Sequence, residues 1–257
     1  MAERRLDVAL LAYGGPQAPE EVVPFLRRLM GRAPSADTIA AVQERYALIG
    51  GASPLPAITA RQARALQTEL EQRRDESYRQ RACAVRVRHG FLFSDPSVAE
   101  CLRQLDADEI VAVPLSPFSS RLTSGRYTEQ IAAAEAASGR GRTIPLLEGW
   151  YASPGFLRAV ARRITASLDG CAADEWALLF TAHSVPAETI AAGDLYVKQL
   201  DEAMRRFSRC WIPAVGGSVF RARGVAAASG RSRRLRMRFV RLRQRVGGGC
   251  WSCRWGS

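Results

Sequence analysis

The sequence contains no run of apolar residues that approaches the eighteen or so needed to span a bilayer. Its start also lacks the cleavage pattern of a secretory signal peptide, because the short apolar run before Tyr13 ends in Gly-Gly-Pro and leads into acidic residues. The six cysteines are scattered along the chain. These absences predict a cytoplasmic protein with reduced thiols and no transmembrane segment.

Acidic residues are absent from residues 208–257, which contain 12 arginines and no lysine. The whole chain has 37 basic and 25 acidic residues and a formal net charge of +12. The first 207 residues therefore carry 25 of each sign, and the entire net charge belongs to the last fifty. Because globular surfaces normally mix both signs, the composition predicts a folded part that ends near Phe207, followed by a disordered basic tail.

The common phosphate motifs are absent as well. No G-x-x-x-x-G-K-[ST] occurs, and no G-x-G-x-x-G follows an expected strand, which disfavours nucleotide binding. The arginine run over 231–245 is typical of an arm that binds nucleic acid or anionic lipid. Cys250 and Cys253 form a single C-x-x-C, half of a four-ligand site, so we expect neither zinc nor an iron–sulfur cluster there.

Residues 1–207 alternate short apolar runs with amphipathic segments. This alternation predicts a parallel α/β sheet covered by helices on both faces. Strands are expected over 6–14, 83–91, 109–115, 143–150 and 175–184. Helices are expected from Pro19 and over 35–46, 59–74, 98–105, 124–137, 156–168 and 194–207.

Ligands of such sheets bind beyond the carboxyl ends of the strands. Three expected strand ends therefore stand out, at 13–16, 114–117 and 181–184. His183 in the last of them is either a metal ligand or general base, or a histidine that only closes a strand. Tyr13 either contacts a ligand beside its Gly-Gly-Pro turn or closes the edge of the core. The chain's other histidine, His89, is expected to be structural or exposed.

Five phrases occur in a fixed order over residues 5–207: LLAYGGPQAPEEVVPFLR, ERYALIGGASPLPAITARQARAL, VPLSPFSSRLTSGRY, EGWYASPGF and LLFTAHSVPAETIAAGDLYVKQL. Together they resemble the ferrochelatase family, lyases that insert ferrous iron into a porphyrin. The resemblance implies a chelatase-like fold of two Rossmann-like, doubly wound α/β domains. The second is incomplete here. The implied divisions are a first domain over 1–142, a partial second domain over 143–207 and the tail over 208–257.

Ala12-Tyr13-Gly-Gly-Pro16 stands where members acting on protoporphyrin more often carry Asn-Leu-Gly-Thr-Pro. The tyrosine form is similar to the coproporphyrin III ferrochelatases of haem biosynthesis, in which the matching tyrosine is an axial ligand of the product iron. The resemblance implies that His183 is catalytic, as an iron ligand or proton acceptor. It implies porphyrin contacts by Tyr13, Arg28, Arg45, Tyr46, Ser53 and Tyr127.

The implied partners are coproporphyrin III or protoporphyrin IX, Fe²⁺ as a substrate, and other enzymes of the haem pathway. No resident cofactor is required. The family also carries a glutamate opposite His183, within a D-H-x-E phrase, and nothing from Ser208 onwards matches it. Since 36 arginines accompany one lysine, the coding sequence is expected to be GC-rich, and its other frames encode Arg, Gly, Ala and Ser in excess. Our hypothesis is that residues 208–257 are a frameshifted reading and that the chelatase is impaired.

Two alternatives remain open. One is a protoporphyrin IX ferrochelatase, or another tetrapyrrole chelatase. The other is a non-catalytic porphyrin-binding protein whose arginine-rich arm binds nucleic acid, although nucleic acid is the less favoured partner.

Overall fold

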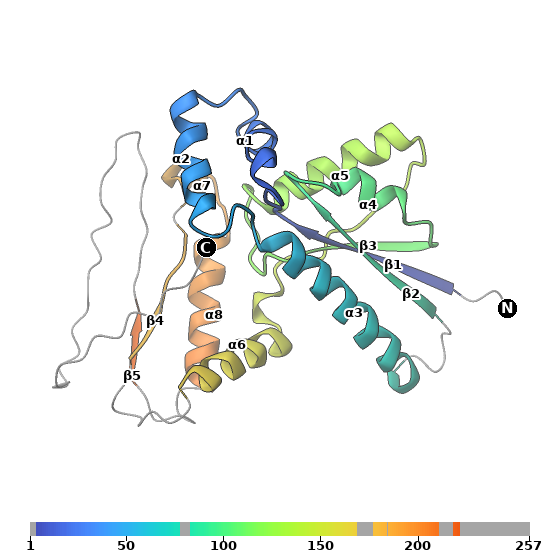
Figure 1. The fold of residues 1–257 in the computed structure, drawn as a ribbon. Coiled ribbons are helices and arrows are strands. Elements are labelled where there is room, and N and C mark those ends of the chain that lie inside the picture. The colour runs from blue at the N-terminus through green and yellow to red at the C-terminus, as the bar shows by residue number, and fades with distance from the viewer. Residues whose placement is uncertain (1–3, 78–82, 169–176, 184, 211–217, 222–257) are drawn as a thin grey trace. The chain divides into compact units, whose positions relative to one another are not determined.

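The computed structural model describes residues 4–77, 83–168, 177–183, 185–210 and 218–221 (Figure 1). Ser184 at the end of the last predicted strand, the arginine run over 231–245, and Cys250 and Cys253 lie outside these residues. The chain divides into two compact units, Met1–Gly149 and Trp150–Ser257, and each is described by itself.

The first unit is built on three parallel strands. They are β1 (Arg4–Ala12), β2 (Cys83–Phe91) and β3 (Glu109–Pro114), in the order β2-β1-β3 (Figure 1). Ala12 pairs with Phe91, and Leu11 pairs with Pro114, so all three strands end at one edge of the sheet. The expected parallel α/β arrangement is confirmed for this unit.

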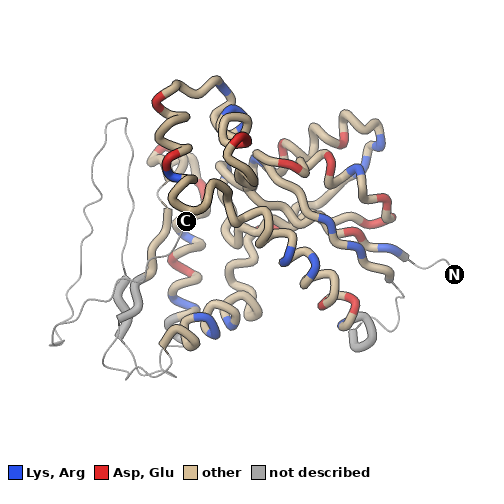
Figure 2. Tube along the Cα trace, viewed as in Figure 1, with Lys and Arg blue, Asp and Glu red and all other residues tan. Residues whose placement is uncertain are grey.

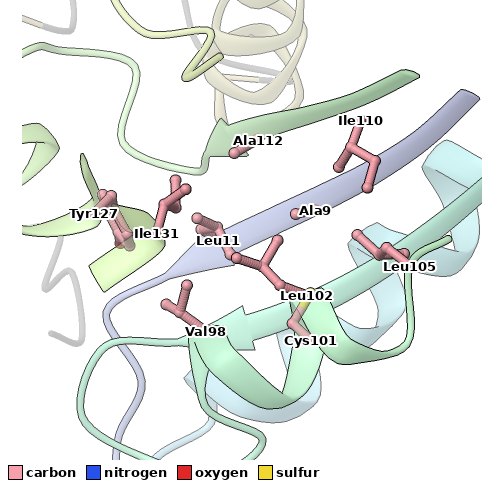
Figure 3. Close-up of a cluster of buried hydrophobic side chains, with 10 residues drawn as sticks. All are labelled: Ala9, Leu11, Val98, Cys101, Leu102, Leu105, Ile110, Ala112, Tyr127 and Ile131. Carbon is pink, nitrogen blue, oxygen red and sulfur yellow. The ribbon is translucent and has the colours of Figure 1, made fainter. Parts of the chain in front are cut away.

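Helices cover both faces of β1. Ala9 and Leu11 on one face join a buried cluster with residues of α4 (Val98–Arg103) and α5 (Ser124–Ser138), drawn in Figure 3. Val8 and Leu10 on the other face pack against α3 (Leu55–Ser77). Successive strand residues point to opposite faces, and both sets are apolar, as expected of a strand buried between two helical layers.

A pair of helices, α1 (Val22–Met30) and α2 (Ala36–Ala47), forms a third buried cluster with the loop after β2. A 3-10 turn, η1 (Pro19–Glu21), leads into α1. The Ser35 side chain accepts a hydrogen bond from the Thr38 N–H, which is the cap predicted for α2. Phe93, from the loop after β2, is buried among side chains of both helices.

The prediction of a strand over 143–150 is wrong, because this segment forms only one isolated β-bridge. Leu146 pairs with Ala112 of β3, where the Ala112 N–H donates to the Pro145 carbonyl at 2.9 Å. Pro145 has no N–H to continue a ladder. Ile144 and Leu146 pack on the cluster of Figure 3. Residues 143–149 of this segment therefore belong to the first unit, and only its Trp150 belongs to the second.

The second unit contains η2 (Trp150–Ala152), α6 (Pro154–Ser167), β4 (Ala177–Phe180), α7 (Ala187–Ala191), α8 (Tyr196–Cys210) and β5 (Ser218–Arg221). β4 and β5 pair in parallel. β5 corrects the expectation that no regular element follows Phe207, since four residues are too few to show a period. The Phe180 and Phe207 rings meet edge-on at 5.4 Å and join β4 to α8.

Basic and acidic residues are interspersed along the described elements (Figure 2). Several form ion pairs within one helix, such as Arg73 with Glu69 and Arg206 with Glu202. Among the described helices, none is both long and apolar enough to cross a membrane.

Candidate functional site

Tyr13 is the first residue after β1, at the edge where the strands end. Its side chain is 36% exposed, and its ring meets the Phe93 ring edge-on with 4.7 Å between centroids. The Phe93 N–H also donates to the Tyr13 carbonyl at 3.2 Å. The phenol is therefore held by a buried neighbour while part of the side chain faces solvent.

The two glycines after Tyr13 form a turn in which backbone lies directly against other side chains. Gly14 has a φ of 87°, and a Cβ there would lie 2.3 Å from the Ser94 hydroxyl. A Cβ on Gly15 would lie 2.6 Å from the Ser53 hydroxyl. Both positions require glycine, Gly14 for its left-handed backbone and both for space.

Two serines hold this turn. The Gly15 N–H donates to the Ser94 hydroxyl at 3.2 Å in a buried hydrogen bond. The Ser53 N–H donates to the Pro16 carbonyl at 2.7 Å, and the Ser53 hydroxyl accepts from the Leu55 N–H at 3.3 Å. Ser53 therefore links the Tyr13 turn to the start of α3.

Tyr46 lies beside the same turn. Its hydroxyl is 3.9 Å from the position that a Cβ on Gly15 would take, and its carbonyl accepts from the Gly51 N–H at 2.8 Å. Burial raises the pKa of the Tyr46 phenol, which stays a neutral hydrogen-bonding group at pH 7. Arg45 precedes it on α2 and is exposed. The structure thus brings Tyr13, Tyr46 and Ser53 together around one turn.

Tyr127 is placed differently from the other predicted contact residues. It is 2% exposed and belongs to the buried cluster of Figure 3. Burial, with a smaller contribution from Tyr13, raises the pKa of Tyr127 above its usual range. Its phenol is therefore neutral and lies near Tyr13 from the core side.

Arg28 is not an isolated cation. Its guanidinium forms an ion pair with Asp95, in the loop that follows β2. The same loop supplies Phe93 and Ser94 to the Tyr13 turn. Sequence reasoning missed this loop, although its place after the carboxyl end of β2 was the available signal.

Arg126 was also missed. It lies in the first turn of α5, is exposed, and places its guanidinium carbon 5.4 Å from the centroid of the Phe93 ring. Tyr13 and Arg126 therefore both contact the buried ring of Phe93. The available signals were its position directly before Tyr127 and its place within the phrase VPLSPFSSRLTSGRY.

His183, in the second unit, follows β4 and is exposed. Its backbone is held by Tyr196, whose phenol oxygen takes a hydrogen bond from the His183 backbone. Burial raises the pKa of Tyr196, and that hydrogen bond partly offsets the effect. The buried Asp194 carboxylate accepts from the Tyr196 N–H at 2.9 Å and fixes the start of α8. The backbone of His183 is thus held in place by a hydrogen bond, while the residue is exposed to solvent.

His89 lies within β2, with its ring edge-on to Phe91 at 5.5 Å. Burial lowers its pKa, and the positive charges of Arg64 and Arg88 lower it further. Its imidazole is therefore neutral at pH 7, in keeping with a structural role. Within the described ranges, no cluster of three or more His, Cys, Asp or Glu side chains is arranged to hold a metal ion.

The family model described as Ferrochelatase matches residues 7–211. The coproporphyrin III ferrochelatase of Anoxybacillus flavithermus is 33% identical over 209 residues, 79% of this chain and 64% of that protein. That of Geobacillus sp. is 31% identical, over 80% of this chain and 66% of that protein. The ferrochelatase of Synechococcus sp. is 31% identical, over 77% of this chain and 55% of that protein. The matched part of the chain thus spans less than two thirds of each relative.

Proposed function

Because the chain belongs to the ferrochelatase family, we propose that it binds coproporphyrin III and inserts ferrous iron into it. The relatives named for this porphyrin support the choice of substrate. The observation that carries the proposal is the partly exposed Tyr13 phenol beside the Gly14–Gly15 turn. A phenol in that position suits the axial ligand of a metallated ring.

A flat macrocycle with four propionates needs apolar surface and hydrogen-bond donors at its rim. Large apolar side chains are exposed directly after Tyr46, where Leu48 is 82% and Ile49 is 54% exposed. Exposed apolar residues of this size suit the face of a porphyrin. The exposed guanidinium of Arg45, next to Tyr46, suits a propionate.

Metallation releases two pyrrole protons as Fe²⁺ enters the ring. A site that favours a bent macrocycle turns the nitrogen lone pairs towards the metal and so stabilises the transition state. We assign His183 to iron delivery or proton acceptance, because a neutral imidazole does both. Its exposure and its braced backbone support this role. Tyr13 would then ligate the iron of the product.

We also propose that insertion by this chain is slow, because nothing in residues 208–257 supplies the glutamate that the resemblance implies. The family match ends at residue 211, close to the change in composition at Phe207, and this supports a frameshift near that point. The nucleotide sequence across codons 205–215 tests the idea. If neither alternative frame encodes a D-H-x-E phrase, the frameshift is wrong.

Porphyrin binding is tested on the whole chain by titration with coproporphyrin III and protoporphyrin IX, followed by porphyrin fluorescence. We expect coproporphyrin III to bind about tenfold more tightly, through its two additional carboxylates. Tyr13→Phe should keep the affinity for the free porphyrin but remove the tyrosinate absorption that the product shows once air has oxidised its iron to Fe³⁺. Tighter binding of protoporphyrin IX would favour the other branch of the family, and binding of neither porphyrin would overturn the proposal.

Insertion is measured anaerobically with Fe²⁺, with His183→Ala as the variant. We expect a low but measurable rate that falls by at least about a hundredfold in this variant, as for loss of a general base. Porphyrin affinity should not change. An unaltered rate would remove His183 from the chemistry.

A further inference from the structure

We infer that Arg126 is a carboxylate-binding residue that anchors one propionate of the porphyrin beside Tyr13. The inference rests on the proposed function, since it concerns how the same porphyrin is held. Arg126 lies within the phrase VPLSPFSSRLTSGRY, but it is not among the contact residues that the resemblance implies. Its case depends on its surroundings in the fold.

The first argument is position. The Arg126 guanidinium carbon lies over the Phe93 ring at 5.4 Å from the centroid, and the same ring meets Tyr13 edge-on at 4.7 Å. A single buried ring therefore separates the guanidinium from the phenol. Propionates project from the rim of a porphyrin, so a cation for them belongs to the side of the iron ligand and not directly over it.

The second argument is that the guanidinium is held but not neutralised. Arg28, Arg86 and Arg142 form ion pairs with Asp95, Asp7 and Glu135. Within the described part of the chain, no carboxylate forms such a pair with Arg126, and its side chain is exposed. Stacking on an aromatic face leaves the in-plane N–H donors of an arginine available. These donors match a carboxylate in a bidentate geometry.

The third argument is that stabilisation of α5 does not account for an arginine at this position. Arg126 is in the first turn of α5, where the helix dipole disfavours a positive charge. The next residue, Tyr127, lies near the Tyr13 phenol on the core side. The chain thus places an exposed cation next to the buried Tyr127 in the first turn of α5. A bound carboxylate would be favoured there by both the charge and the helix end.

The test uses the whole chain and measures the dissociation constants of coproporphyrin III and of its tetramethyl ester. The ester keeps the ring and removes the four negative charges. Arg126→Gln should weaken binding of the acid about tenfold, as for loss of a charge-assisted hydrogen bond. It should change binding of the ester less than about twofold. Arg126→Lys should recover part of the loss, since a lysine keeps the charge but not the planar fork.

Arg73→Gln is the matched control. Arg73 is exposed on the last turns of α3, far along the helix from Ser53, and pairs with Glu69. Arg73→Gln removes the same charge from the chain as Arg126→Gln. An unchanged affinity of Arg73→Gln for coproporphyrin III therefore shows that the loss of net charge does not cause the weaker binding of Arg126→Gln. If Arg126→Gln binds the acid within twofold of the unmodified chain, the inference is overturned. Equal weakening of acid and ester also overturns it, because that result indicates altered packing. If the unmodified chain binds no coproporphyrin III, the proposed function itself fails.

Discussion

Arg28 and Asp95 form a two-bond ion pair between α1 and the loop after β2. Arg28 Nη1 donates to Asp95 Oδ1 at 3.0 Å, and Nη2 donates to Oδ2 at 3.2 Å. The Gln17 side-chain amide donates to the Asp95 carbonyl at 3.1 Å. The pair therefore ties α1 to the loop that supplies Ser94 and Phe93 to the Tyr13 turn. Any contact between Arg28 and a propionate has to compete with Asp95.

This competition gives a prediction for Asp95→Asn. The substitution removes the charge that neutralises Arg28, so we expect coproporphyrin III to bind about two- to fivefold more tightly, the change expected of an exposed charge pair. The double variant with Arg28→Gln should lose this gain. Affinities come from fluorescence titration of the single and double variants. If Asp95→Asn raises the affinity equally with and without Arg28, release of Arg28 from the ion pair is not the cause of the tighter binding.

The same pair should contribute little to folding. Its side chains are 46% and 64% exposed, and exposed pairs typically stabilise by about 0.2–1 kcal/mol. A double-mutant cycle of Arg28→Ala and Asp95→Ala, read from urea unfolding, should give a coupling in that range that decreases in high salt. A coupling above about 2 kcal/mol would contradict this description.

Gly14→Ala tests the turn beside Tyr13. The left-handed backbone at φ 87° and the approach of 2.3 Å to Ser94 should together destabilise the protein by about 2–4 kcal/mol. Gly139→Ala is the matched control, since Gly139 has a φ of 65° but open space around its Cβ position. It should cost only about 1 kcal/mol. Equal losses of unfolding free energy would mean that close approach has no effect at Gly14.

Asp7 predicts a pH dependence of stability. Burial raises its pKa, but hydrogen bonds from Arg86 and from the Ala107 and Asp106 N–H groups outweigh it, so the pKa lies below the usual 3.8. A lowered folded-state pKa adds stability that is present above the unfolded pKa and is lost as pH falls through the folded value. Asp7→Asn should lower the free energy of unfolding by about 3 kcal/mol at pH 7. The difference in unfolding free energy between the variant and the unmodified chain should become smaller below about pH 4.

Urea unfolding at pH 7 and pH 3 measures this difference. Asp108→Asn is the control, because Asp108 is an exposed aspartate of the same unit. It should change the unfolding free energy by less than about 0.5 kcal/mol at either pH. A constant gap for Asp7→Asn at both pH values would show that its carboxylate is not the stabilising group.

Cys101 should resist thiol reagents in the folded protein. Its side chain is fully buried, and burial raises its pKa to about 12, with Arg88 lowering it slightly. At pH 8 almost no thiolate is present, and the thiolate is the reactive form. Peptide mapping after treatment with iodoacetamide should show Cys101 unmodified without urea and fully modified in it. Rapid modification in the native state would contradict its burial.

Much of the fold was predictable because the signals are local. Each of the three strands of the first sheet is a run of mainly apolar or alternating residues. Ser35 marks the start of α2 as predicted. The segment around Pro145 misled the prediction, since its apolar residues suit a strand but its proline cannot continue the ladder. Strand β5 was missed because its pairing with β4, and not its own pattern, makes it a strand.

The sequence by itself determined the three strands of the first sheet and most of the helices, the strand end that carries Tyr13 and the glycine turn after it, and the family. These depend on neighbours along the chain. Only the tertiary structure decided that Arg28 pairs with Asp95 and that Tyr127 is buried. It also decided that Tyr13 and Arg126 contact the same ring, that of Phe93. Arg28 and Asp95 are 67 residues apart, and no periodicity connects them. Their contact exists because β1 and β2 pair in parallel and bring the loops after both strands to one edge of the sheet.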